Sequence, residues 1–192
     1  FRQQEENHIM ENIKEEIKKT EKIAVSSEQK QAEATVKTQK TIPPTPEQQK
    51  QFEAFFKDLE INYEKDKETG LYIIDNYVVN FSNIEKHRKF MQNNNITEDD
   101  LFKYIQEIKG NADFEGTKLT SLGNLKEIGG NANFENSPIT DLGNLEKIGG
   151  NANFRHSPIT SLCNLEKIGG DAEFEFSRIT SLGKLKVIGG DA

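Results

Sequence analysis

The thiol of Cys163 is the first group to consider for chemistry, because the chain has no other cysteine. A catalytic thiol needs a neighbouring group that lowers its pKa, such as a histidine or a basic residue. No acid and no histidine adjoins Cys163 in the sequence, and Cys163 stands where other copies of a repeat have Gly123, Gly143 and Gly183. We therefore interpret Cys163 as a substitution within the repeat and expect no catalytic residue.

Metal and cofactor chemistry would need other groupings of residues. The histidines His8, His87 and His156 fall in three different segments, so a metal-ligand spacing is absent. No glycine loop is followed by a phosphate-binding lysine, and no nucleophile elbow is present. The Gly-Gly-Asn-Ala runs resemble calcium-binding β-rolls, but those need a nine-residue period with Asp in every copy. We expect no metal, no cofactor and no enzymatic activity.

A gapless repeat of 20 residues contains most of the remaining residues that could form a functional site. Six apolar columns recur at this spacing, starting at Ile108, Ala112, Phe114, Leu119, Leu122 and Leu125. A fixed period of this length indicates a solenoid in which each coil contacts only its neighbours.

The spacing within one copy predicts the path of a coil. Ala132 and Phe134 alternate with polar residues, which predicts a strand over 131–135 with both side chains pointing inward. Gly129 and Gly130 precede it, where a chain reversal favours positive φ or close backbone approach. The rest of each coil is expected to be an irregular or 3₁₀ return. Copies then stack in parallel, so that each apolar column forms a ladder along the axis.

The pattern Ala-x-Phe-x-x-Ser-x-Ile-x-x-Leu-x-x-Leu-x-x-Ile resembles leucine-rich repeats, and is similar to the short bacterial kind and to receptor L-domain repeats. The resemblance covers residues 108–192. It implies a protein-recognition scaffold without chemistry of its own. It also implies that hydroxyl groups cap the turn after each strand, at Thr117, Ser137, Ser157 and Ser177. Alanine replaces the usual leucine at the first inward position, which suggests a flatter and tighter coil.

The resemblance further implies that the outward side of the strands is the binding face. Its columns are mostly Asn, Asp and Glu, and the departures are Arg155, His156 and Phe176. Aromatic residues and arginine dominate binding energy at interfaces, so we expect these three to form a protein-binding patch. Neighbouring positions complete the candidate face: Asn133, Asn153 and Glu135. The alternative is that the Asn columns only carry hydrogen bonds between coils and that Phe176 is repeat drift.

The segments before the repeat have a different composition. Residues 1–24 predict a docking or coiled-coil helix, or alternatively a solvated helix, with a stripe that includes Ile9, Ile13 and Ile17. Self-association through this helix is a further expectation. Residues 25–44 are mostly Ser, Gln, Lys, Thr, Ala and Glu, end in a pair of prolines, and predict a flexible linker.

Residues 45–107 predict a small helical or α+β capping domain. The expected elements are a helix that Thr45 caps, a hairpin of 71–74 and 77–81 around Asp75–Asn76, and two more helices. These two begin at Ser82 and Thr97, and the second is expected to run to about Gln106. The complete expectation is an α+β chain: N-terminal helix, linker, cap, and a parallel β solenoid over 108–192 that continues past Ala192.

Net charge and hydropathy exclude two classes of function. The net charge of −7 disfavours nucleic acid, and no apolar run approaches the ~18 residues of a membrane span. We expect a non-enzymatic interaction scaffold that binds another protein through the strand face. The alternatives are a bacterial effector or enzyme whose catalytic domain lies outside this chain, and a structural subunit of a virion or cell-surface assembly. Cytoplasmic and virion or cell-surface locations are equally compatible with the sequence.

Overall fold

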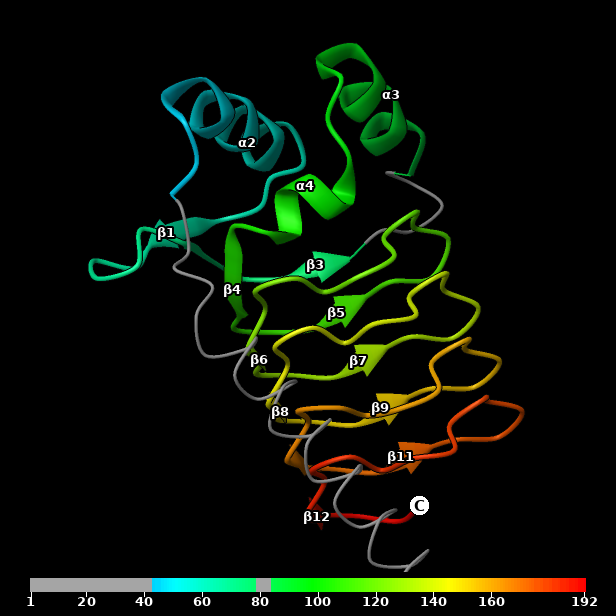
Figure 1. The fold of residues 1–192 in the computed structure, drawn as a ribbon. Coiled ribbons are helices and arrows are strands. Elements are labelled where there is room, and N and C mark those ends of the chain that lie inside the picture. Colours follow the sequence, from blue (N-terminus) through cyan, green and yellow to red (C-terminus); the bar gives the residue numbers. More distant parts are fainter. Residues whose placement is uncertain (1–42, 79–83) are drawn as a thin grey trace, which may run out of the picture. The chain divides into compact units, whose positions relative to one another are not determined.

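The structure is a computed structural model that describes residues 43–78 and 84–192. Each coil of the solenoid contributes two short strands. Within these residues the strands build two mainly parallel sheets along one solenoid axis (Figure 1). Sheet A contains, in spatial order, β1 (Tyr63–Lys65), β2 (Tyr72–Ile74), β4 (Ile105–Ile108), β6 (Glu127–Ile128), β8 (Lys147–Ile148), β10 (Lys167–Ile168) and β12 (Val187–Ile188). Sheet B contains β11 (Ala172–Glu173), β9 (Ala152–Asn153), β7 (Ala132–Asn133), β5 (Ala112–Asp113) and β3 (Tyr77–Val78). The predicted α+β class with a parallel β solenoid is confirmed.

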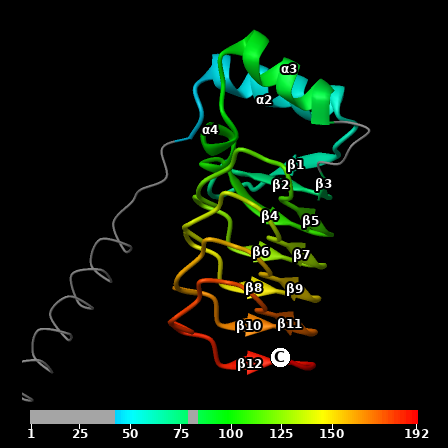
Figure 2. The same cartoon turned by 90° about the vertical axis from the view of Figure 1, so that its right-hand side faces the viewer.

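From β4 and β5 onward, the register of both sheets follows the repeat without a slip, whereas the pairing of β2 with β4 shifts between Tyr72 and Ile73. Ile128 pairs with Ile148, and Ala132 pairs with Ala152, in parallel ladders. The expectation of one strand per coil is wrong, because β6, β8, β10 and β12 add a second strand just before each corner (Figure 2). Only two residues are extended there, which is too short for an alternating pattern to mark a strand in the sequence. Stacking of identical coils pairs their backbones nonetheless.

The Gly-Gly corner between the two sheets is required by close backbone approach. A β-carbon on Gly149 would lie 2.1 Å from the carbonyl oxygen of Gly129 in the preceding coil. A β-carbon on Gly150 would lie 2.1 Å from Oδ1 of Asn131. Of the two predicted reasons for these glycines, close approach is therefore the one that applies here.

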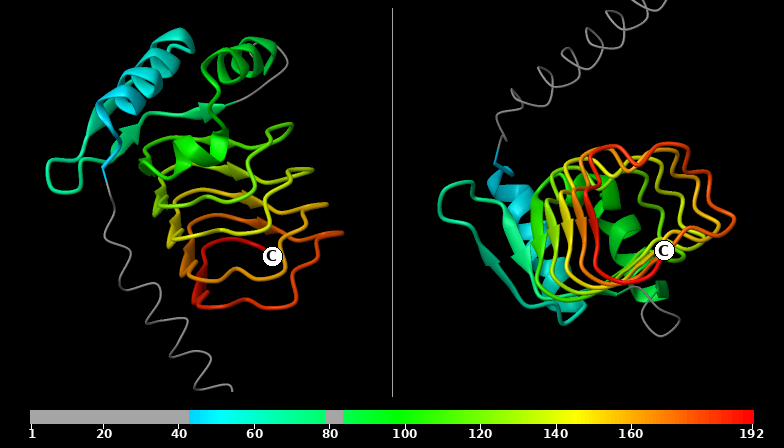
Figure 3. Two further views of the ribbon diagram at one scale, coloured as in Figure 1. Left: turned by 45° about the horizontal axis from the view of Figure 1, so that its top comes forward. Right: turned by 90° about the horizontal axis from the view of Figure 1, so that it is seen from below.

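The core is a set of side-chain columns inside the coils. The backbones of successive coils lie over one another when viewed along the axis (Figure 3). The rings of Phe114, Phe134, Phe154 and Phe174 stack with centroid distances of 5.2, 4.9 and 5.5 Å. Tyr77 pairs in register with Ala112, but its ring lies 5.8 Å from that of Phe114 at the end of this stack. Each coil thus buries one aromatic ring against the rings of its neighbours.

The predicted hairpin around Asp75–Asn76 is wrong. β2 pairs with β4 in sheet A, and β3 pairs with β5 in sheet B, both in parallel. Residues 75–76 therefore turn the chain from one sheet to the other, as the Gly-Gly corner does in later coils. Ile74 and Tyr77 fill the inward columns that later hold isoleucine and alanine, and this burial favours the coil over a hairpin.

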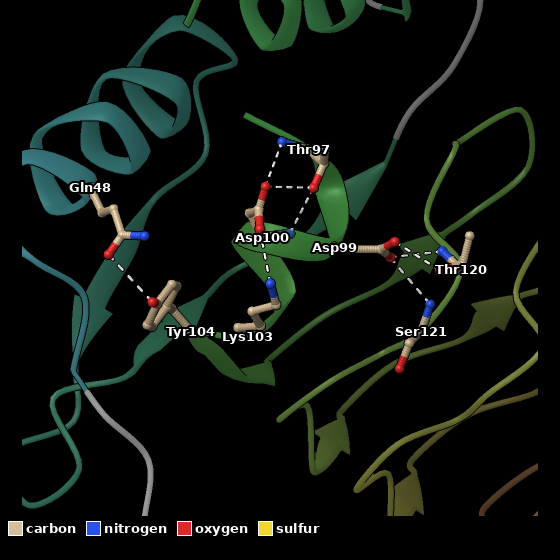
Figure 4. A network of polar contacts seen from close by, with 8 residues as sticks. All are labelled: Gln48, Thr97, Asp99, Asp100, Lys103, Tyr104, Thr120 and Ser121. Atoms are coloured by element: carbon tan, nitrogen blue, oxygen red, sulfur yellow. Dashed lines mark hydrogen bonds and ion pairs between the residues drawn. The ribbon is translucent and has the colours of Figure 1, made fainter. Parts of the chain in front are cut away.

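In the described part of the chain, three helices lie at the N-terminal end of the solenoid: α2 (Pro46–Asp58), α3 (Ile84–Asn94) and α4 (Glu98–Phe102). The predicted capping boxes at Thr45 and Thr97 are both present. Figure 4 shows Asp100 bonded to Thr97 and Lys103, while Tyr104 donates to Gln48 of α2. The expected helix end near Gln106 is wrong, because α4 stops at Phe102 and the chain enters β4.

Cap and coils are continuous. β4 runs across the predicted boundary between residues 107 and 108, and one hydrophobic core extends from the phenylalanines of α2 into the coils. The predicted N-terminal helix with Ile9, Ile13 and Ile17 lies outside the described residues, as do residues 25–42 of the linker and the cap expected at Ser82. No helix in the described ranges has the length and apolar character to cross a bilayer.

Candidate functional site

The outward side of sheet B is the face that the sequence analysis proposed for binding. A shallow groove of about 380 Å³ runs along it, with alanines of the coils at its floor. Its two walls are the outward columns of β5, β7, β9 and β11 and of the residues that precede them. Four of the wall residues are Asn133, Asn153, Asp171 and Glu173.

The first wall is a ladder of asparagine side chains between coils. Oδ1 of Asn111 accepts from the backbone N of Asn131 at 2.8 Å, and Oδ1 of Asn131 accepts from Asn151 at 2.8 Å. Asn76 begins the ladder and Asp171 continues it in the last coil. This column therefore has the structural role that the sequence analysis gave as the alternative to binding.

Hydrogen bonds also fix the side chains of the second wall. Nδ2 of Asn133 donates to Asp113 at 3.0 Å, and Nδ2 of Asn153 donates to Glu135 at 3.0 Å. Oδ1 of Asn153 in turn accepts from the backbone of Arg155. The predicted site residues Asn133, Asn153 and Glu135 thus lie together on the face, with several of their polar atoms in fixed directions.

The predicted residues Arg155, His156 and Phe176 come together from two adjacent coils. The rings of His156 and Phe176 stack at 5.0 Å with an interplanar angle of 13°, and 67% of Phe176 is exposed. Nη2 of Arg155 lies 2.9 Å from Oε2 of Glu175, and Nη1 lies 3.8 Å from Glu173. The structure therefore assembles an exposed aromatic pair beside an arginine and two carboxylates.

The backbone at this pair is strained. His156 and Phe176 have φ angles of 53° and 56°, in the left-handed region that bulky residues rarely occupy. Glycine occupies the same repeat position in the first coil, as Gly116 with φ of 71°. Phenylalanine at such a position costs about 1–2 kcal/mol relative to an unstrained conformation. Asn136 has the same conformation with φ of 51°, so the turn of the repeat sets this backbone in every copy.

Cys163 occupies the glycine position at another corner of the coil. Its φ is 46°, beside 56° for Gly143 and 55° for Gly183, and the residue is exposed. The structure thus places it where the repeat substitution interpretation expects it.

A buried polar cluster of Tyr77, His87 and Glu98 was not predicted from the sequence. Nε2 of His87 lies 3.2 Å from both the Tyr77 hydroxyl and Oε1 of Glu98, and Oε2 of Glu98 accepts from the backbone N of Lys118. The three residues come from β3, α3 and α4, so no periodic signal connects them.

Burial sets the protonation of this cluster. It lowers the pKa of His87 to about 4, with a smaller contribution from Arg88, and raises the pKa of Glu98 to about 7, with a smaller contribution from Asp99. The pKa of the Tyr77 hydroxyl lies well above its ordinary value, mainly because of burial and to a smaller extent because of the carboxylate of Glu98. His87 and Glu98 therefore form a neutral hydrogen bond rather than an ion pair near pH 6. A cavity of about 450 Å³ adjoins them, but their facing polar atoms are already paired, which indicates a structural role.

Comparisons of the chain with protein-family models, with curated proteins and with solved structures give no match. In the described residues, no three or more His, Cys, Asp or Glu side chains are grouped so that they could hold a metal ion.

Proposed function

We propose that this chain is a non-enzymatic protein-binding module that contacts its partner through the outer face of sheet B. The observation that carries this proposal is the exposed stack of His156 on Phe176 beside the groove of that face. A large aromatic ring that is two-thirds exposed gains most from burial in a partner.

The rigidity of the face supports the same proposal. Hydrogen bonds between coils hold Asn131, Asn133 and Asn153 in place. Side chains that are ordered before binding lose little conformational entropy when a partner docks. A shallow groove with alanines at its floor and fixed polar walls suits an extended or flat protein segment better than a small molecule.

Two expectations from the sequence belong to this proposal. The resemblance to leucine-rich repeats implies recognition through the strand side of a solenoid. A helix over residues 1–24, with Ile9, Ile13 and Ile17 on one stripe, would supply docking or self-association separate from the groove.

Affinity capture with an internal control tests the proposal. The intact chain, the variant His156→Ala/Phe176→Ala and the control Val187→Ala are used as baits in parallel. Val187 is also exposed, at 46%, but lies on sheet A. We expect a protein that the intact chain and the control retain and the double variant loses, at equal thermal stability of all three. Retention of the same proteins by all three baits contradicts binding through this face.

A further inference from the structure

The solenoid distributes its charges unevenly between its sides. The outer face of sheet B carries six carboxylates and the single cation Arg155. The carboxylates are Asp113, Glu115, Glu135, Asp171, Glu173 and Glu175. The rest of residues 108–192 has eight basic and five acidic residues. A segment that is nearly neutral as a whole therefore has one acidic face and three basic excess charges elsewhere.

The groove on this face matches a short extended chain in size. It crosses β5, β7, β9 and β11, whose spacing of about 4.8 Å per strand spans about 14 Å, or about four residues of extended polypeptide. Asp113 stands at one end of the groove and Asp171 and Glu173 at the other. Positive side chains along such a segment would meet carboxylates at both ends.

The aromatic pair adds a contact for a cation beside the groove. The exposed ring of Phe176 lies next to Glu175 in sequence, and a cation over an aromatic face is attracted by the ring as well as by the acid. Arg155 shows that the face accommodates a guanidinium, because its Nη atoms lie against Glu175 and Glu173.

We propose that the groove of sheet B binds an extended protein segment that carries lysine or arginine side chains. This inference rests on the proposed function and specifies the partner's chemistry. Complementary charge accelerates association and excludes acidic competitors, whereas phosphate-rich polymers are repelled by the same carboxylates.

Synthetic peptides test the charge requirement directly. The intact chain is titrated with a fluorescent ten-residue peptide of alternating Lys and Gly, and with the same peptide carrying Gln in place of Lys. The variant Asp171→Asn/Glu173→Gln removes two groove carboxylates, and Asp171→Asn restores the asparagine of the other coils. The control Glu107→Gln/Glu146→Gln removes the same charge on and beside sheet A, away from the groove.

We expect the lysine peptide to bind the intact chain and the control alike, and the groove variant about three- to tenfold more weakly. Binding should weaken further from about 0.1 M to about 1 M salt, where the Debye length falls from about 10 Å to about 3 Å. Equal binding of the glutamine peptide, or equal binding by the groove variant and the intact chain, overturns the inference. If a captured partner depends on Phe176 but its contacting segment is neutral or acidic, the charge inference fails while the proposed function stands.

Discussion

The carboxylate of Asp99 takes the place of a backbone carbonyl for Thr120. It accepts from the backbone N of Thr120 at 2.8 Å and from the Thr120 hydroxyl at 2.7 Å (Figure 4). One coil later, the backbone N of Thr140 donates to the carbonyl oxygen of Thr120 at 3.0 Å. A side chain of α4 thus closes the hydrogen-bond ladder that would otherwise be open at the start of the repeat, which is how the cap ends the solenoid.

Removal of this acceptor should destabilise the first coil. We expect Asp99→Ala to lower the free energy of unfolding by about 1–2 kcal/mol, because the backbone N atoms of Thr120 and Ser121 and the Thr120 hydroxyl lose a charged partner. Asp99→Asn keeps an acceptor oxygen and should lose less than half of that amount. Urea unfolding followed by circular dichroism measures both. Equal stability of Asp99→Ala and the unmodified chain would show that water replaces the carboxylate without loss.

The buried pair of His87 and Glu98 gives opposite pH dependences that cancel. The pKa of His87 is about 4 in the folded chain against an ordinary 6.5, so its contribution to stability is present above pH 6.5 and is lost as the pH falls towards 4. The pKa of Glu98 is about 7 against an ordinary 4.5, so its contribution is present below pH 4.5 and is lost as the pH rises through 7. Between pH 4.5 and 6.5 the two slopes offset each other.

Single variants of the pair should therefore show slopes of opposite sign. In Glu98→Gln, His87 alone remains, and the free energy of unfolding should rise with pH between 4 and 6.5. In His87→Gln, Glu98 alone remains, and the free energy should fall with pH between 4.5 and 7. One proton gives at most about 1.4 kcal/mol per pH unit. The double variant supplies the background of all other groups, and identical slopes in both single variants would refute the neutral pair.

The solenoid was predictable because its columns repeat. Inward positions such as Phe134 recur with fixed spacing, and this spacing also predicted that His156 and Phe176 would lie side by side on neighbouring coils. What the repeat could not show is the pairing of Arg155 with Glu175, because both side chains are long and their directions depend on the neighbouring coil.

The coil of β2 and β3, which precedes the first coil of the repeat, was not predictable from the period. Ile74 and Tyr77 lie in the columns that Ile108 and Ala112 continue in the next coil. Because α3 and α4 are inserted before β4, the separation in sequence is not the 20 residues of the repeat. Asp75–Asn76 between two β-prone runs is also consistent with a hairpin by residue type, and tertiary burial overrides it. The cluster of Tyr77, His87 and Glu98 depends on the same insertion, and only the folded arrangement reveals it.

Cys163 offers a test of backbone strain that is independent of partner binding. It is the one copy of its column without glycine, at a φ of 46°. We expect Cys163→Gly to raise the free energy of unfolding by about 0.5–1 kcal/mol, since relief of left-handed strain outweighs the greater flexibility of glycine when unfolded. The reverse change, Gly143→Cys, should destabilise the chain, because a β-carbon there would lie 2.5 Å from the carbonyl oxygen of Gly123. Thermal and urea unfolding of both variants under reducing conditions decide the question, and loss of stability in Cys163→Gly would contradict it.

The asparagine ladder and the Gly-Gly corner should be energetically coupled. A β-carbon on Gly170 would lie 1.9 Å from Oδ1 of Asn151, the same oxygen that accepts from the backbone N of Asp171 at 3.0 Å. Glycine is thus needed at 170 because the asparagine of the preceding coil occupies the space above it.

A double-mutant cycle measures this coupling. Asn151→Ala should cost about 1 kcal/mol through the lost hydrogen bond, and Gly170→Ala about 1–3 kcal/mol through the clash. In Asn151→Ala/Gly170→Ala the clashing oxygen is gone, so the double variant should be more stable than the sum of the single losses predicts, by about 0.5–2 kcal/mol. Simple additivity would mean that the clash is with the backbone N of Asn151, which lies 3.1 Å from the same β-carbon. In that case the backbone path of the coil alone would require glycine at position 170, and other residues could replace the asparagine without affecting this requirement.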